Sequence, residues 1–129
     1  MNKIIAEISI GELLDKISIL EIKQGKIKDS EKLKFINNEH SILKNQMEKI
    51  VKSGDKLNDL YQSLKEINSK LWVIEDDKRQ CEKEKDFGDK FIKLSRDVHF
   101  LNDDRAKIKL EINNHTGSVI KEIKEYTSY

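Results

Sequence analysis

A small set of polar side chains in this chain could form a binding centre within elements otherwise suited to helical packing. The clearest members are Glu75, Asn102 and Arg105, which interrupt the apolar stripes of two helical segments. A carboxylate, an amide and a guanidinium within reach of one another can hold a polar ligand through several hydrogen bonds. We therefore interpret this group as the start of a binding site.

The order of these residues around a turn supports that interpretation. A hairpin turn near Phe87 would place residues equally distant from it at the same level. In this register Glu75 and Arg105 are offset along the helix axes by about 9 Å. A long guanidinium side chain spans most of that offset, with Asn102 between the two charged groups.

The segment "SIGELLDKISILEIKQGKI" (9–27) is expected to approach this centre, because it carries apolar residues on nearly every side. A helix that is apolar all round is buried by several partners. Only Asp15 and Ser18 mark a strip that we expect to face solvent. The charged residues expected on covered flanks are Lys16, Glu21 and Lys23.

Two further side chains complete the predicted site. Trp72 lies on one flank of the third helical segment, and Lys109 lies on an edge of the stripe in the fourth. The ligand-binding residues predicted from the sequence are Lys16, Glu21, Lys23, Trp72, Glu75, Asn102, Arg105 and Lys109. A structural alternative remains open, because mid-stripe polar residues also fix the register of packed helices.

Four helical segments follow from apolar residues spaced by three and four, separated by short polar breaks. The predicted N-caps are Ser9 (in a capping box with Glu12), Asp29 or Ser30, Asp55, and Asp89. Short breaks predict that consecutive helices are antiparallel neighbours. The predicted fold is all-α: a single domain over 1–129, an antiparallel bundle of about four helices with the first central. Short extended segments are expected at both termini, where the tail is either a short helix or an arm folded onto the bundle.

Composition narrows the class of protein. The chain has 129 residues with no proline, 25 basic and 24 acidic side chains and a net charge of +1. With charges this balanced, the protein has no strong positive electrostatic potential that would attract the phosphates of nucleic acid, so no nucleic-acid partner is expected. Cys81 is the only cysteine, and no apolar run approaches the roughly 20 residues that span a bilayer. We predict a soluble cytoplasmic protein without membrane insertion.

Motifs for catalysis and for metal binding are missing from the sequence. There is no glycine-rich phosphate loop, no GxSxG and no HExxH, so no catalytic residue or cofactor is predicted. His99 and His115 have no partner at metal-ligand spacing, and no metal site is expected. His40 is interpreted as a packed, hydrogen-bonded side chain.

Three stretches resemble a known family: "ISIGELLDKISILEIK" (8–23), "LWVIEDDKR" (71–79) and "LSRDVHFLNDDRAKIKLEIN" (94–113). They are similar to an uncharacterised family of short bacterial proteins with GELLDKISILEIK, LWxIED and NDxRAxIK motifs. The resemblance implies association with cell-surface sugar assembly and no assigned activity. The polar positions that match are Asp15, Lys16, Glu21, Lys23, Trp72, Glu75, Asp76, Arg96, Asn102, Asp103, Arg105 and Lys109. His99 departs from the aromatic residue expected there.

Three functions remain open on the sequence. The favoured one is a small ligand-binding or accessory domain whose polar centre binds an anionic small molecule or a partner enzyme. The first alternative is a small all-α enzyme acting on an anionic metabolite, like a chorismate mutase or a nucleotide pyrophosphohydrolase. The second is a structural helical scaffold. A second stripe on the fourth segment (Ile92, His99, Ala106, Leu110) indicates either a contact with the tail or a homodimer surface.

Overall fold

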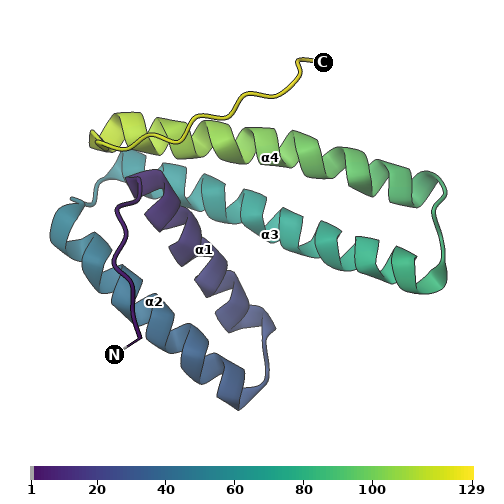
Figure 1. The fold of residues 1–129 in the computed structure, drawn as a ribbon, viewed down its shortest axis with the longest axis horizontal. Helices are drawn as coiled ribbons and strands as arrows, with labels where there is room; N and C mark the ends of the chain where they lie inside the picture. Colours follow the sequence, from purple (N-terminus) through teal and green to yellow (C-terminus); the bar gives the residue numbers. More distant parts are fainter. Residues whose placement is uncertain (1) are drawn as a thin grey trace.

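The chain folds into two antiparallel helical hairpins that diverge from a shared end (Figure 1). This computed structural model describes residues 2–129. The helices are α1 (Ile10–Lys26), α2 (Ser30–Ile50), α3 (Asp55–Glu84) and α4 (Asp89–Thr116). No strand occurs among the described residues. The prediction of an all-α fold with four helices is confirmed.

The helices begin close to the predicted residues. Ser9 caps α1 by accepting a hydrogen bond from the Glu12 N–H at 3.0 Å, and Asp29 caps α2. The prediction that Asp55 and Asp89 are N-caps is wrong by one residue. These two aspartates are the first residues of α3 and α4, and a glycine precedes each. An aspartate in the first turn still complements the helix dipole, so the sequence signal is the same at either position.

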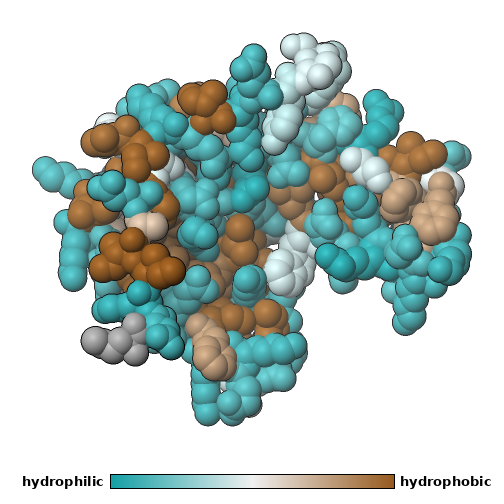
Figure 2. Space-filling model, in the orientation of Figure 1, coloured by the Kyte–Doolittle hydropathy of each residue, from teal (hydrophilic) through white to brown (hydrophobic). Residues whose placement is uncertain are grey.

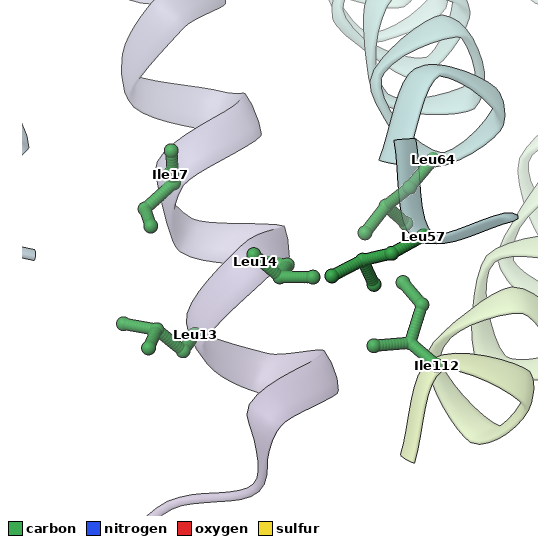
Figure 3. Packing of buried hydrophobic residues seen from close by; sticks show 6 residues of the cluster. All are labelled: Leu13, Leu14, Ile17, Leu57, Leu64 and Ile112. Atoms are coloured by element: carbon green, nitrogen blue, oxygen red, sulfur yellow. The ribbon is translucent and has the colours of Figure 1, made fainter. Parts of the chain in front are cut away.

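α1 lies at the centre of the fold and contacts each of the other three helices, as predicted. Leu14 points towards Leu57 and Ile112 on α3 and α4, whereas Leu13 and Ile17 point to the opposite side of α1 (Figure 3). Ile17 and Ile112 are fully buried. The core is therefore built around two faces of one short helix.

The expectation that all consecutive helices pack on one another is wrong for α2 and α3. Within residues 2–129, α2 makes helix–helix contacts with α1 alone, and α3 packs on α1 and α4. No residue of α2 is buried. The short link from 51 to 54 only joins the ends of these two helices, since both of them are held by α1.

Both terminal segments are extended, as the sequence predicts. The C-terminal segment runs back along α4 as an arm (Figure 1). Its apolar side chains remain largely in solvent, with Val119 99% and Ile123 75% exposed. Among the described helices, none is both long enough and apolar enough to cross a membrane.

Candidate functional site

A buried ion pair joins the first and last helices at the centre of the fold. Asp15 and Ser18 are 1% and 0% exposed, so the prediction that they form an open strip is wrong. The helical periodicity of residues 9–27 predicted that they face solvent because they are polar. On a helix covered by three neighbours, however, polar side chains can lie inside when they find partners.

Asp15 receives hydrogen bonds from two other helices. Arg105 on α4 donates through Nε at 3.1 Å and also through Nη2, and Asn68 on α3 donates at 2.8 Å. Asn68 also donates to the Ser18 hydroxyl, which in turn donates to the Asp15 carbonyl. Burial alone would raise the pKa of Asp15, but the bonds from Arg105 and Asn68 outweigh it and lower this pKa.

A buried lysine extends the ion pair towards the C-terminal arm. The Lys109 side chain is 7% exposed, and its Nζ lies 2.6 Å from Glu12, 3.7 Å from Asp15 and 3.4 Å from Glu122. Burial would lower the pKa of Lys109, whereas the carboxylates of Glu12 and Asp15 raise it above its ordinary value. Because Glu12 binds this lysine, the predicted capping box forms only its Ser9 half.

The start of α1 is also held by the end of α4 and by Ser118, just after that helix. The N–H groups of Ile10 and Gly11 donate to the Ser118 hydroxyl at 3.1 Å and the Asn113 amide oxygen at 2.7 Å. A Cβ on Gly11 would lie only 2.6 Å from the Lys109 carbonyl oxygen. Glycine is therefore needed where these two helices cross, and this close approach places Asp15 within reach of α4.

A second polar cluster connects the two hairpins. Glu21 accepts hydrogen bonds from His40 at 2.9 Å, from the Tyr61 hydroxyl and from Lys65 at 3.3 Å. Burial would raise the pKa of Glu21, but these three donors lower it. Burial and the hydrogen bond to the Glu21 carboxylate raise the pKa of Tyr61. His40 is hydrogen-bonded, as the sequence predicts.

A groove of about 400 Å³ opens beside the buried ion pair, between the second half of α1 and the flank of α3. The surface is notched where the two hairpins diverge (Figure 2). The groove is lined by Ile19, Ile22, Asn68, Leu71, Trp72, Glu75, Asp76, Arg79 and Arg105. Three of the predicted site residues therefore share one surface: Trp72, Glu75 and Arg105.

The predicted pairing of Glu75 with Arg105 is wrong, because Arg105 binds Asp15 and the Glu75 side chain is exposed on α3. The register across the α3–α4 turn compares positions along these two helices only. It gives no information about α1, which supplies Asp15 as the partner of Arg105. Arg79 was absent from the predicted residues, and Asp76 was named only as a position that matches the family motif. The spacing 68, 72, 75, 76, 79 along one helix flank is the signal that could have found them.

The remaining predicted residues lie elsewhere. Lys16 is exposed and 3.7 Å from Glu12, and Lys23 is half-buried. The prediction that Asn102 lies between Glu75 and Arg105 is wrong, because Asn102 is exposed and lines the gap between α4 and the C-terminal arm. Glu21 and Lys109 belong to the two polar clusters, outside the groove.

The groove combines an apolar surface with hydrogen-bonding groups of both kinds. Leu71 and Trp72 are half-buried, whereas Glu75, Asp76 and Arg79 are exposed. Arg105 already shares its charge with Asp15, and its Nη1 makes no hydrogen bond to any described residue. Among residues 2–129, no group of three or more histidine, cysteine, aspartate or glutamate side chains is arranged to hold a metal ion.

The class defined by this fold is an all-α domain of four helices with a polar junction between the first and the last. A comparison with protein families matches residues 4–129 to a family of unknown function, DUF6165, and the chain belongs to that family. No curated protein and no solved structure matches the chain.

Proposed function

We propose that this protein is a small ligand-binding domain whose groove holds a neutral saccharide unit. One observation carries the proposal: Trp72 lines a single groove with Glu75, Asp76, Arg79 and Arg105, whose guanidinium is held by a buried carboxylate. A pyranose has an apolar C–H face and a rim of hydroxyl groups. An aromatic ring suits the face, and carboxylates and guanidinium groups suit the rim.

The charges of the groove favour such a ligand over a polyanion. Glu75 and Asp76 oppose Arg79, and Asp15 offsets Arg105. The groove therefore offers acceptors and donors in similar number without a net positive field. The anionic small molecule expected from the sequence becomes the less favoured ligand class.

The fixed orientation of Arg105 supports binding. Its Nε and Nη2 are both held by Asp15, so few side-chain conformations are lost when a ligand accepts a bond from the free Nη1 edge. As an accessory domain, the protein would present the saccharide to a partner enzyme of cell-surface sugar assembly. We place that role in the cytoplasm, where a lone thiol such as that of Cys81 stays reduced.

Tryptophan fluorescence tests the proposal directly, because Trp72 is the only tryptophan. Titration with glucose, N-acetylglucosamine and glucuronate should give a saturable change in emission for at least one sugar. Glu75→Gln should weaken that binding about tenfold or more, as expected for a lost hydrogen bond to a charged group. The matched control is Asp59→Asn, an exposed carboxylate on α3 outside the groove.

The proposal fails if no sugar changes the emission of Trp72, or if Glu75→Gln binds as tightly as the wild type. A marked preference for glucuronate over the neutral sugars would instead support the anionic ligand. Isothermal titration of Trp72→Phe, which retains an aromatic ring, separates loss of the fluorophore from loss of the site.

A further inference from the structure

A second groove lies between α2 and α3, where these helices fail to pack on each other. It has a volume of about 680 Å³, within the range of small-molecule sites. Leu14, Met47, Leu57 and Val51 supply its apolar surface, and Leu14 and Leu57 belong to the core of the domain. Leu14 and Leu57 are only 2% and 6% exposed, so the groove lies over one buried side of the core near the link between the hairpins.

The rim of this groove is basic. Lys44, Lys49 and Lys52 line it, against the single carboxylate of Glu48. The saccharide groove, in contrast, carries carboxylates and guanidinium groups in equal number. An apolar base with cations around it complements a molecule that has an apolar chain and an anionic head.

α2, which forms one side of the groove, can shift to admit a ligand. No residue of α2 is buried, and α2 is held by α1 alone among the described helices. A helix with few buried contacts shifts at a small free-energy cost. The first turn of α3 also lies at the groove through Leu57 and Asn58, and its N-cap, Gly54, makes no side-chain bond to the free N–H groups there. These donors add to the lysines.

We propose that the groove between α2 and α3 binds a single-chain anionic amphiphile, with the acyl chain against Met47, Ile50 and Val51, over the buried Leu14 and Leu57, and the anionic head among Lys44, Lys49 and Lys52. The volume suits one acyl chain better than the two chains of a phospholipid. The proposal is independent of the saccharide groove, which lies between α1 and α3 on other residues.

Methyl NMR of Met47 tests this proposal, since the chain has only two methionines and Met47→Leu assigns the signal. Dodecyl phosphate below its micelle concentration should shift the Met47 methyl signal saturably. Dodecyl maltoside, with the same chain and a neutral head, should bind at least tenfold more weakly. Inorganic phosphate alone should leave the Met47 methyl signal unchanged. Dodecyl phosphate should leave the fluorescence emission of Trp72 unchanged.

Replacement of the rim lysines is the decisive experiment. Lys44→Gln/Lys49→Gln/Lys52→Gln should weaken dodecyl phosphate binding at least tenfold. The control is Lys26→Gln/Lys28→Gln/Lys32→Gln, which removes three exposed lysines near the other end of α2. Equal loss in both triple variants, equal binding of dodecyl maltoside, or an unchanged Met47 signal would each overturn the proposal. Co-sedimentation with phosphatidylglycerol vesicles without a Met47 shift would likewise overturn it, by assigning the basic surface to a membrane.

Discussion

Replacing Asp15 by asparagine should lower the stability of the domain by about 3 kcal/mol at neutral pH. The substitution keeps the shape of the side chain but removes the charge that faces Arg105. Breaking a buried ion pair costs roughly 3–5 kcal/mol, because it strands the remaining charge. The Asp15 side chain is 2% exposed and that of Arg105 is 25% exposed, so water can reach the stranded guanidinium. The cost should therefore fall at the lower end of that range.

Urea unfolding followed by circular dichroism measures this cost. A loss of about 3 kcal/mol should move the midpoint down by on the order of 1–3 M for a domain of this size. Asp59→Asn provides the control, because this exposed carboxylate on α3 has no ion-pair partner among the described residues. It should change stability by less than about 0.5 kcal/mol.

The pH dependence gives the same prediction an independent readout. The folded-state pKa of Asp15 is lowered, so its contribution is present above the unfolded pKa of about 3.9 and is lost as pH falls through the folded value. The difference between wild type and Asp15→Asn should be constant above about pH 5 and should shrink below about pH 4. Equal stability at pH 7, or a difference that persists unchanged in acid, would refute the assignment of a structural ion pair to Asp15.

Four further substitutions test other parts of the structure by urea unfolding. Gly11→Ala should destabilise by about 1–3 kcal/mol, because its Cβ would meet the backbone of α4, whereas Gly25→Ala, with open space around it, should stabilise by up to about 1 kcal/mol. Similar effects at both glycines would contradict the close helix crossing. Leu64→Ala removes a fully buried side chain and should cost about 2–5 kcal/mol; a cost below 1 kcal/mol would place Leu64 outside the core. Tyr61→Phe should cost about 1–2 kcal/mol through the lost bond to Glu21, and no loss would show that this bond is dispensable.

The number and the order of the helices could be predicted because they depend on local information. Apolar residues spaced by three and four define four segments, and Ser9 and Asp29 mark two of their starts. The central position of α1 followed from the apolar residues around it. These features need no knowledge of which helix meets which, so the sequence carries them directly.

The ion pair could not be placed in the same way, because Asp15 and Arg105 are 90 residues apart and their meeting depends on the crossing of α1 and α4. A signal was nevertheless present. Gly11, Asp15 and Ser18 follow one another at spacings of four and three, which forms a narrow stripe of small or polar residues on an apolar helix. Such a stripe permits close approach of a second helix and requires that helix to supply polar partners.

Arg105 belongs both to the buried ion pair and to the groove for which we propose a ligand. A buried ion pair contributes little net stability compared with apolar residues of similar volume, so stability alone explains Arg105 poorly. The guanidinium also lines the groove beside Trp72, and the carboxylate beneath it holds its orientation. In the fold, Glu75, Asp76 and Arg79 are exposed and Trp72 is half-buried, yet all four gather around this one preorganised donor. We therefore propose a ligand that uses these donors and acceptors together, in preference to a purely structural role for Arg105.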